Sequence, residues 1–417
     1  MGERQPTDDD RDPSSISIAE ARERVLGALV PLDGGECIAT GEALGRVLAA
    51  TIHSPIDVPR FRASAMDGYA LRHAERESPL QVVGRSLAGH PFDGTVPAGA
   101  CVRITTGAQV PGDADTVVQQ ENVRRDDDIV HVTTLPEPGL HVRAIGSDSA
   151  RGAELIPGGT RLAAGELALL AAHGLTTVDV VRTLRVALFS TGDELVEPGE
   201  PPGAGQIHDA NRALLVALLA EPGVTVQDLG ICPDSPEALE RTLDAAQGAD
   251  VVVSSGGVSV GEADHVREAL AAHGQVDIWK VAMKPGRPLT FGHARGGLAF
   301  FGLPGNPVSA AITALLFVRP ALEHLRGLAD TRPPPMSARL DDALRKRPGR
   351  VEFQRGILSS DAEGRSVVRT TGLQDSHVLV SLQRANCLIE LPLDSSGARA
   401  GERVTVHPFT RFARAPL

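Results

Sequence analysis

Residues 249–254 are Ala-Asp-Val-Val-Val-Ser, and Ser255-Gly256-Gly257 follows them directly. The valines do not alternate with polar residues, as expected of a strand that other elements cover on both faces. Such strands are typical of parallel sheets, where a glycine-rich turn often leads from a strand into a helix or binds an anion. This stretch therefore predicts a parallel sheet at the centre of a domain.

Strand and helix patterns alternate on both sides of this stretch, from about residue 184 to 327. The predicted strands are residues 185–189, 224–229, 276–282 and 298–301, and the predicted helices are 211–220, 236–246, 263–272 and 307–325. A regular alternation of this kind predicts a doubly wound α/β sheet with mostly parallel strands.

The flanking segments have different patterns. Residues 17–48 and 161–173 have helical periodicity, residues 57–140 contain short strands between Gly, Pro and Asp, and the Pro-rich stretch 331–335 precedes more short strands. We therefore expect several domains. They are a disordered tail (1–15), a segmented helical domain (16–56 and 141–181), an inserted β-rich domain (57–140), the α/β domain (182–330) and a C-terminal β-barrel (331–417).

Charge and composition exclude several classes of protein. The net charge of −12 opposes non-specific binding to nucleic acid. No apolar run approaches the roughly 18 uncharged residues of a membrane helix, and the N-terminus lacks the apolar core of an export signal. The four cysteines are far apart, so we expect reduced thiols rather than disulfides or a metal site. We expect a cytoplasmic protein.

Polar and glycine-rich segments follow four of the predicted strands. Because ligands of open α/β sheets bind beyond the carboxyl ends of the strands, we expect a binding site there. A tight strand-to-helix turn explains the glycine-rich loop equally well, and Asn306-Pro307 is first of all an ordinary helix start. The residues expected to contact the ligand are Ser190, Thr191, Gly192, Ser255, Gly256, Gly257, Ser259, Gly261, Arg287, Pro304, Gly305 and Asn306.

Carboxylates also follow the predicted strands, at Asp193, Glu194, Asp234 and Asp264. Oxygen ligands of this kind suit Mg²⁺, which proteins often share with a substrate phosphate. For Asp234 a helix-capping role is equally plausible, because Ser235-Pro236 follows it. The sequence therefore predicts a magnesium site at this edge of the sheet.

Lysine is rare in this chain: only Lys280, Lys284 and Lys346 are lysines among the 41 Lys and Arg residues. Two of them lie four positions apart. In an extended segment residues 280, 282 and 284 share one face, so both ammonium groups can point into one cleft, with Arg287 close behind. The alternative is a solvated basic face. We favour a binding role, because arginine serves almost everywhere else, and we expect the backbone at Gly286 to approach the ligand.

Taken together, these segments resemble the molybdopterin molybdenumtransferase family, which includes the C-terminal half of gephyrin. The matching motifs are SAMDGYA (64–70), RITTGAQVPGDADTVV (103–118), STGDEL (190–195), SSGGVSVGEAD (254–264), WKVAMKPGRP (279–288), GLPGNPVSA (302–310), FQRG (353–356) and Ser376-His377. The resemblance extends from about residue 17 to the end. The departures are Arg62 and Ala63 before SAMDGYA, Thr105, and Ser235 in place of a second acid.

The resemblance implies both a fold and a reaction. The fold is the four-part arrangement given above, in a homodimer whose active cleft is shared between subunits. The reaction inserts molybdate into adenylylated molybdopterin, with release of AMP and with Mg²⁺ as cofactor. The implied partners are the adenylyltransferase enzyme and apo-molybdoenzymes. The implied functional residues are Asp67, Thr106, Glu194, Asp234, Asp264, Lys280, Lys284, Arg355 and Ser376.

Two other functions are compatible with the same motifs. One is a non-catalytic scaffold, which loss of the acidic and lysine residues would favour. The other is a family member that inserts tungstate or acts on a related nucleotide-pterin, because tungstate and molybdate are nearly equal in size and charge.

Overall fold

The computed structural model describes residues 12–134, 136–256, 275–294, 297–328 and 334–409. Contacts divide the chain into two units. The first comprises residues 1–36, 45–47 and 180–417, and the second comprises residues 37–44 and 48–179. The predicted helix over 263–272 lies outside the described residues.

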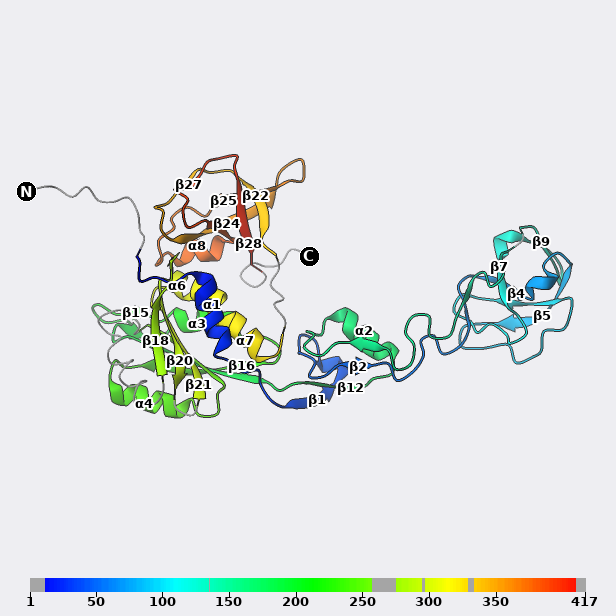
Figure 1. Ribbon diagram of the computed structural model, residues 1–417, viewed down its shortest axis with the longest axis horizontal. Coiled ribbons are helices and arrows are strands. Elements are labelled where there is room, and N and C mark those ends of the chain that lie inside the picture. The colour runs from blue at the N-terminus through cyan, green and yellow to red at the C-terminus, as the bar shows by residue number, and fades with distance from the viewer. Residues whose placement is uncertain (1–11, 135, 257–274, 295–296, 329–333, 410–417) are drawn as a thin grey trace, which may run out of the picture. The chain divides into compact units, whose positions relative to one another are not determined.

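A six-stranded sheet forms the centre of the first unit (Figure 1), in the order β16-β13-β17-β21-β20-β18. Its four consecutive strands from β16 to β21 are parallel, which confirms the predicted class of fold. The strands are β13 (Leu184–Thr191), β16 (Val224–Cys232), β17 (Val251–Ser255), β18 (Gln275–Lys280), β20 (Pro288–Ala294) and β21 (Leu298–Leu303).

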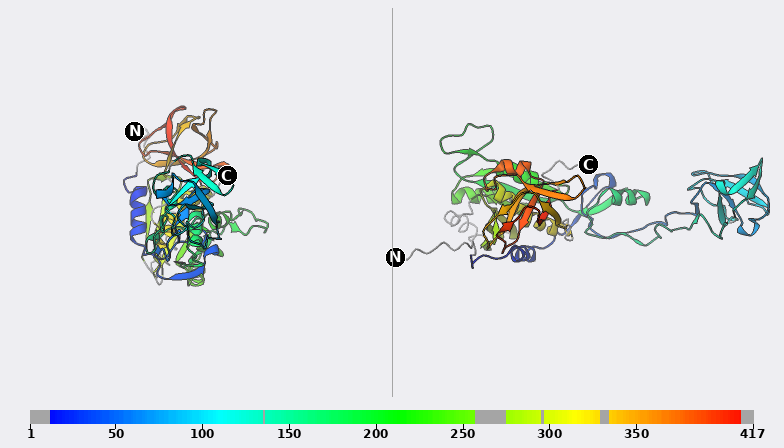
Figure 2. Two further views of the ribbon diagram at one scale, coloured as in Figure 1. Left: turned by 90° about the vertical axis from the view of Figure 1, so that its right-hand side faces the viewer. Right: turned by 90° about the horizontal axis from the view of Figure 1, so that it is seen from above.

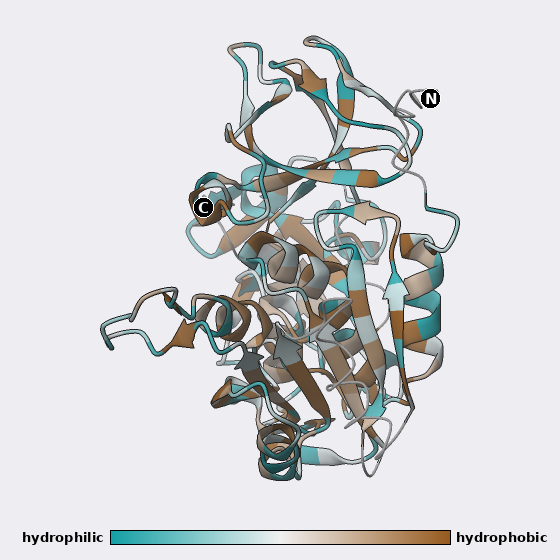
Figure 3. Cartoon of the chain, turned by 90° about the vertical axis from the view of Figure 1, so that its left-hand side faces the viewer, coloured by the Kyte–Doolittle hydropathy of each residue, from teal (hydrophilic) through white to brown (hydrophobic). Residues whose placement is uncertain are grey.

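Strand β17 is covered on both faces, as its run of valines predicts. Val251 and Val253 lie in the core on one side of the sheet, and Val252 lies in the core on the other side. All three are fully buried, and each buried valine contributes about 1.5–3 kcal/mol relative to exposure. Hydrophobic colours run along most of the sheet in Figure 3.

Helices cover the two faces unequally. Residues of α1 (Ile18–Gly27), α3 (Asn211–Leu219), α6 (Pro307–Thr313) and α7 (Arg319–Leu325) pack in the larger core, and α4 (Pro236–Ala245) packs in the smaller one. A π-helical stretch, Ala314–Val318, joins α6 to α7 into the long helix that the sequence predicts. This composite helix, Pro307–Leu325, is long and apolar enough to cross a membrane, but 67% of its most apolar window is buried inside the fold. It is therefore a core helix.

Two sequence expectations for this unit are wrong. Strand β20 was not predicted, and it runs antiparallel to both β21 and β18. Its sequence begins with Pro288 and contains Gly292, which weaken any strand pattern. Helix α1 was expected to open a separate helical domain, but its buried residues Ala21 and Val25 belong to the α/β core.

The region over residues 17–48 is also less helical than its pattern indicates. After α1 the chain forms strand β1 (Gly35–Ala39) and a single 3₁₀ turn, Thr40–Glu42. Strand β1 pairs with β12 (Thr177–Val181), about 140 residues later. Local periodicity carries no information on such a distant partner.

The N-terminal segment is partly ordered. Residues 12–15, expected in a disordered tail, form a turn in which Ser15 N–H donates to the carbonyl of Asp12 at 2.9 Å. Ile16 then pairs with the segment after β18, because its N–H donates to Lys280 (2.9 Å) and its carbonyl accepts from Ala282 (2.8 Å). Residues 12–16 therefore form a strap beside the lysine segment.

A closed five-stranded barrel completes the first unit (Figure 2), as the sequence predicts. Strand β19 (Met283–Lys284) joins the barrel by pairing with β24, which ties the lysine segment to the barrel. The barrel strands are β22 (Met336–Leu340), β24 (Val351–Ser360), β25 (Ser366–Thr370), β26 (Cys387–Leu391) and β28 (Arg403–Pro408). The unit also contains α8 (Leu379–Arg384) and the pairs β14 (Leu195–Val196) with β15 (Ile207–His208) and β23 (Leu344–Arg345) with β27 (Gly397–Ala398).

The second unit is built mainly of strands. Its largest sheet has the order β7-β4-β6-β5-β9-β8. These strands are β4 (Gly68–Leu71), β5 (Leu80–Ser86), β6 (Ala100–Ile104), β7 (Thr116–Gln119), β8 (Val123–Asp126) and β9 (Ile129–Val132). Four of them, β5, β6, β7 and β9, overlap the runs that the sequence predicts as short strands, residues 81–83, 101–104, 116–118 and 129–133. Shorter elements are β2 (Ile52–His53), β3 (Ala63–Ser64), β10 (Val142–Arg143), β11 (Glu154–Ile156) and α2 (Ala164–Ala172), together with the 3₁₀ turns His73–Glu75 and Gln120–Asn122.

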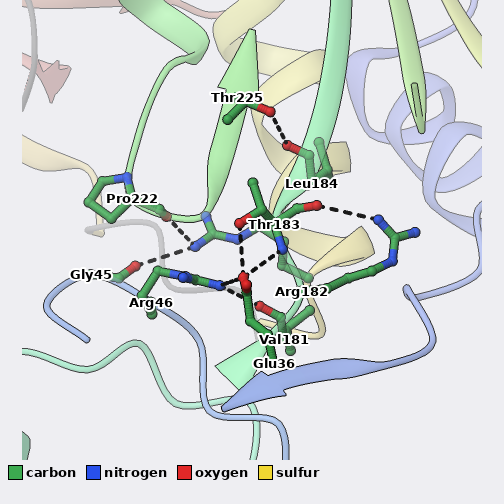
Figure 4. A network of polar contacts seen from close by, with 10 residues as sticks. Glu36, Gly45, Arg46, Val181, Arg182, Thr183, Leu184, Pro222 and Thr225 are labelled. Carbon is green, nitrogen blue, oxygen red and sulfur yellow. Dashed lines mark hydrogen bonds and ion pairs between the residues drawn. The ribbon is translucent and has the colours of Figure 1, made fainter. Parts of the chain in front are cut away.

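A partly buried polar network fixes the chain where it enters strand β13 (Figure 4). The carboxylate of Glu36 accepts hydrogen bonds from Arg46 and from the backbone and hydroxyl of Thr183, the last at 2.9 Å. Arg326, whose side chain is 1% exposed, donates to the carbonyls of Gly45 and Pro222. These contacts join residues 36 and 45–46 to the α/β domain.

Candidate active site

The loops after strands β13, β17 and β21 are held close together. The side-chain amide of Asn211, the first residue of α3, donates to Ser255 Oγ (2.8 Å) and to the carbonyl of Gly305 (2.6 Å). Gly256 has φ +93°, and a Cβ there would lie 2.4 Å from the carbonyl oxygen of Thr191. The glycine is therefore required by close backbone packing. Asn211 is a site residue that the sequence did not reveal, since it resembles an ordinary helix start.

The rest of the glycine-rich loop cannot be placed. Gly257, Ser259, Gly261 and Asp264 lie outside the described residues, so their predicted roles stay predictions.

Three buried hydroxyl groups lie at this edge of the sheet. Ser190, Thr191 and Ser254 are at most 6% exposed, and their hydroxyl oxygens have no hydrogen-bond partner within the described part of the chain. A buried hydroxyl without a partner costs about 1–3 kcal/mol. Such groups are suited to a polar ligand that supplies the missing bonds.

The predicted acidic residues are partly brought together. Asp193 and Glu194 are exposed, and Asp193 Oδ1 accepts the backbone N–H of Asp234 at 3.3 Å. The capping role considered for Asp234 is wrong, because Ser235 caps α4 by accepting from Ala238 N–H. Gly192 has φ +144°, and a Cβ there would lie 2.6 Å from the Glu194 carboxylate. Glycine at this position therefore lets that carboxylate fold back toward the strand end.

The described acids offer oxygen ligands of the kind that Mg²⁺ shares with a substrate phosphate. Within the residues that the structure describes, no cluster of three or more His, Cys, Asp or Glu side chains could hold a metal by itself. Mg²⁺ keeps several waters and is commonly bound by one or two carboxylates together with substrate phosphates. The exposed carboxylates of Asp193 and Glu194 are compatible with that mode of binding.

The lysine segment bends at Ala282, where Met283 N–H donates to the carbonyl of Val281 at 2.7 Å, and buried and exposed side chains alternate along it. Val281 and Met283 are fully buried, whereas the side chains of Lys280 and Lys284 are 47% and 51% exposed. Both lysine side chains are therefore open to solvent, and their pointing into one cleft stays a prediction.

Gly286 has a packing role, and contact of its backbone with a ligand stays a prediction. Gly286 is buried with φ +89°, and a Cβ there would lie 2.4 Å from Thr313 Oγ1 on helix α6. The glycine is needed for packing against that helix.

Each cation of the lysine segment has a carboxylate partner that the sequence did not predict. Asp12 Oδ2 lies 3.4 Å from Lys280 Nζ and also pairs with Arg287. Glu352 Oε2 lies 3.4 Å from Lys284 Nζ. Asp12 is 268 residues from Lys280, so no local pattern could reveal it. Glu352 does directly precede the FQRG motif, and that position is the one available signal.

Arg355 holds a loop rather than facing the solvent. Its side chain is almost fully buried, and the guanidinium donates to Ser381 Oγ (2.9 Å) and to the carbonyl of Asp375 (3.0 Å). Burial lowers the pKa of Arg355 to about 10. The carbonyl of Ser376, which follows Asp375, accepts a hydrogen bond from Val308 N–H at 3.1 Å. Direct contact of Arg355 or Ser376 with a ligand stays a prediction.

The side chain of Asn306, at the start of α6, makes no hydrogen bond to the helix. Asn306 occupies the N-cap position but its side chain makes no capping hydrogen bond, and the residue is exposed. The interpretation of Asn306 as a helix start therefore explains its position, but it does not explain why the side chain is an amide. Pro304, also predicted to contact the ligand, is buried.

Asp67 and Thr106 meet in the second unit. Asp67 Oδ1 accepts both the backbone N–H of Thr106 (2.7 Å) and its hydroxyl (2.9 Å). These bonds, the backbone one foremost, lower the pKa of Asp67. Arg62, one of the departures from the family motif, donates to the carbonyls of Pro111 and Gly112. It therefore braces a loop.

A separate cavity of about 760 Å³ lies at the other edge of the sheet. Ala249, Asp250 and Leu298, at the amino ends of parallel strands, are part of its lining. Ligands of open α/β sheets bind beyond the carboxyl ends, so the chemistry belongs to the loops described above and not to this cavity.

Three family models match the chain in succession. They are the MoeA N-terminal region, domains I and II (residues 16–174), a probable molybdopterin binding domain (187–324) and the MoeA C-terminal region, domain IV (337–409).

Known proteins match over almost the whole length. A molybdopterin molybdenumtransferase of Haemophilus influenzae is 41% identical, over 95% of this chain and 99% of the relative. One of Nostoc is 39% identical, over 87% and 86%. A crystal structure of a MoeA protein of Pyrococcus horikoshii superimposes with a TM-score of 0.82 at 29% identity, over 95% of this chain and all of the other. The chain therefore belongs to the MoeA family of molybdopterin molybdenumtransferases.

Proposed function

We propose that this chain inserts molybdate into adenylylated molybdopterin, with release of AMP, to give molybdenum cofactor. The observation that carries the proposal is the pair of exposed ammonium groups, Lys280 and Lys284, in a chain with one other lysine. They lie at the carboxyl edge of a sheet whose opposite part presents the exposed carboxylates of Asp193 and Glu194.

The spacing of strands separates these groups into two subsites. Strands β13 and β18, which lead to the acids and to the lysines, are four strand positions apart in the sheet. At about 4.8 Å per strand this is roughly 19 Å. An extended substrate, with a nucleotide at one end and a pterin at the other, matches that length better than a compact one.

Different side chains bind the oxyanion and the organic substrate. The ammonium groups of Lys280 and Lys284 bind the oxygens of the tetrahedral oxyanion as compact charges. The unsatisfied hydroxyls of Ser190, Thr191 and Ser254 donate to polar groups of the substrate. Three of the four cysteines are poor nucleophiles, because Cys101, Cys232 and Cys387 are buried and burial raises the pKa of each thiol. Cys37 is exposed but belongs to the second unit, whereas the lysines and the acids belong to the first. The sulfur atoms that bind molybdenum belong to the pterin.

Asp193 and Glu194 would hold Mg²⁺, together with Asp234 and Asp264 as the sequence predicts. Bound there, the cation would offset the negative charge of the pyrophosphate that links the pterin to AMP.

One assay tests the proposal. The purified protein is incubated with adenylylated molybdopterin, Mg²⁺ and either molybdate or tungstate, and both AMP release and cofactor formation are measured. We expect AMP release that depends on Mg²⁺ and on the oxyanion. Faster turnover with tungstate would assign the chain to the tungstate-inserting alternative, and a folded protein that releases no AMP would favour a scaffold.

The variant Glu194→Gln should lower AMP release at least tenfold and leave the melting temperature nearly unchanged. Removing one of several exposed carboxylates deprives the metal of a ligand and relieves mutual repulsion, so the fold loses little. The control is Glu200→Gln, an exposed acid in the loop between β14 and β15. A large loss of stability with normal turnover per folded molecule would show that Glu194 is structural.

We also propose a cytoplasmic homodimer that meets the adenylyltransferase and apo-molybdoenzymes. Membership of the family supports this assembly. Gel filtration coupled to light scattering gives the number of subunits directly.

A further inference from the structure

Glu352 faces Lys284 because of strand register. Strand β24 pairs in parallel with β19, and Lys284 is the direct partner of Glu352 in that pairing. On its other side β24 pairs with β26, where Glu352 lies opposite Leu391. The backbone of Glu352 is therefore fixed on both sides, and its side chain has little freedom in where it places the carboxylate.

The two members of this ion pair differ in exposure. The side chain of Glu352 is 8% exposed, whereas that of Lys284 is 51% exposed. A buried carboxylate is costly unless it is paired and hydrogen-bonded. Glu352 has both: Lys284 Nζ at 3.4 Å, and the side-chain amide of Gln354, which donates to Oε1 at 2.9 Å. Gln354 is itself 5% exposed. The acid is thus built into the barrel, and the lysine reaches across its rim.

The geometry leaves the ammonium group available to a ligand. A charge-assisted N–H···O bond is commonly about 2.7–2.9 Å long, so the 3.4 Å separation is a loose pairing. An ammonium group has three donors, and Glu352 can occupy one of them. The others remain directed away from the buried acid.

We propose that Glu352 is the positioning residue of Lys284: its buried carboxylate holds the lysine ammonium at the open edge of the site, and Gln354 orients that carboxylate. The proposal rests on the proposed function insofar as Lys284 binds the oxyanion. It adds that the C-terminal barrel takes part in substrate binding through an acid that itself contacts no substrate.

Lysine-selective ¹³C labelling tests the pairing directly. The chain has three lysines, so the spectrum of the intact protein contains three side-chain Cε signals, and Lys284→Ala identifies that of Lys284. In Glu352→Gln we expect the Lys284 signal to move and narrow, because the ammonium has lost its fixed partner, while the other two stay in place. The matched control is Glu390→Gln, an acid of the same barrel that pairs with His407 at 2.6 Å. An unmoved Lys284 signal in Glu352→Gln would overturn the proposal.

Kinetics distinguish positioning from a merely structural role. In Glu352→Gln we expect the KM for molybdate to rise roughly tenfold, the usual effect of one lost charge-assisted contact, with a smaller change in kcat. Isothermal titration with molybdate completes the comparison in both backgrounds: Glu352→Gln should raise the Kd roughly tenfold in the wild type but less than about twofold in a Lys284→Ala background, because contacting residues are not additive. An equal effect in both backgrounds would show that Glu352 acts independently of Lys284.

The proposal can still be tested if Glu352→Gln does not fold or if the proposed function is wrong. If Glu352→Gln does not fold, Glu352→Asp keeps the charge and shortens the side chain by one methylene group; it should raise KM and displace the Lys284 signal. If the wild-type protein releases no AMP, the proposed function fails, and the ¹³C spectra still decide whether Glu352 holds Lys284.

Discussion

Each of the three lysines makes contacts that suit a compact ammonium group rather than a guanidinium. Lys280 and Lys284 each meet one carboxylate oxygen at 3.4 Å on an open face. Lys346 Nζ donates to three backbone carbonyls, those of Arg347, Arg350 and Leu393, at 2.8–3.2 Å. The binding role that the scarcity of lysine predicts for Lys280 and Lys284 stays a prediction, whereas Lys346 has a structural role.

Substitution of Lys346 by arginine should destabilise the protein. A planar guanidinium cannot reproduce three bonds that converge on a single nitrogen, and each lost bond costs about 0.5–1.5 kcal/mol. We expect the free energy of unfolding to fall by about 1–3 kcal/mol, measured by urea denaturation. Molybdate insertion per folded molecule should be unchanged. Unaltered stability would mean that the barrel accommodates either cation at this position.

Substitution of Lys284 by arginine should lower molybdate insertion roughly tenfold to a hundredfold. A guanidinium matches a carboxylate bidentately, so Arg at 284 would pair with both oxygens of Glu352 and turn away from the oxyanion. Loss of one charge-assisted contact corresponds to about 1.5–3 kcal/mol, or about one to two decades in rate. The matched control is Arg369→Lys, an exposed position on β25. A near-normal rate for the arginine variant would mean that position 284 supplies charge alone.

At the scale of elements, the sequence predicted what local pattern determines. The run of valines in β17 and the apolar face of α6 and α7 are continuous in sequence, and the structure forms them as predicted. Prediction from the sequence failed for elements whose position depends on pairing with a residue or strand far away in the chain. Strand β1 pairs with the distant strand β12. Strand β20 lies between the predicted strands β21 and β18, although it contains Pro288 and Gly292. Asp12 reaches Lys280 because Ile16 pairs with Val281.

The strap of residues 12–16 places a carboxylate where the site would bind an oxyanion. Asp12 Oδ1 accepts from the backbone and the hydroxyl of Ser14, at 2.9 and 2.7 Å, which directs Oδ2 to Lys280 and Arg287. Hydrogen bonds from Ser14 lower the pKa of Asp12 to about 2. The carboxylate is therefore charged throughout the neutral range and competes with any anionic ligand.

Replacing Asp12 with asparagine should strengthen molybdate binding. The neutral amide no longer competes for the two cations, and one charge-assisted contact is worth about 1.5 kcal/mol or more, so the apparent Kd should fall roughly tenfold. Isothermal titration with molybdate at fixed ionic strength measures this. Glu23→Gln, an exposed position on α1, makes the same change in net charge and should have no effect. Weaker binding in Asp12→Asn would show that the acid helps to hold the ligand.

At the scale of the whole molecule, the candidate site residues fall into two groups within one chain. Asp67 and Thr106 belong to the second unit, whereas the lysines and Glu352 belong to the first. The order of motifs along the sequence could predict that division. It could not show that the barrel contributes Glu352 or that the N-terminal strap contributes Asp12, because both depend on tertiary pairing.

The proposed homodimer makes a quantitative prediction about mixed subunits. Thr106→Ala removes the hydroxyl that donates to Asp67, and Lys284→Ala removes an ammonium group, so each homodimer should be nearly inactive. If every active site takes Thr106 from one chain and Lys284 from the partner, a heterodimer of the two variants has one intact site of two. With random pairing half of the dimers are heterodimers, so co-expression should restore roughly a quarter of wild-type turnover per chain.

In the control mixture, a double variant takes the place of the Lys284→Ala chain. Thr106→Ala co-expressed with the double variant Thr106→Ala, Lys284→Ala cannot form an intact site in any pairing, so it should stay inactive at the same protein concentration. Recovery in the first mixture and not in the second would establish that the two groups act across subunits, since no single chain in either mixture carries both. If neither mixture recovers while both single variants fold and dimerise, each chain must supply Thr106 and Lys284 to its own site.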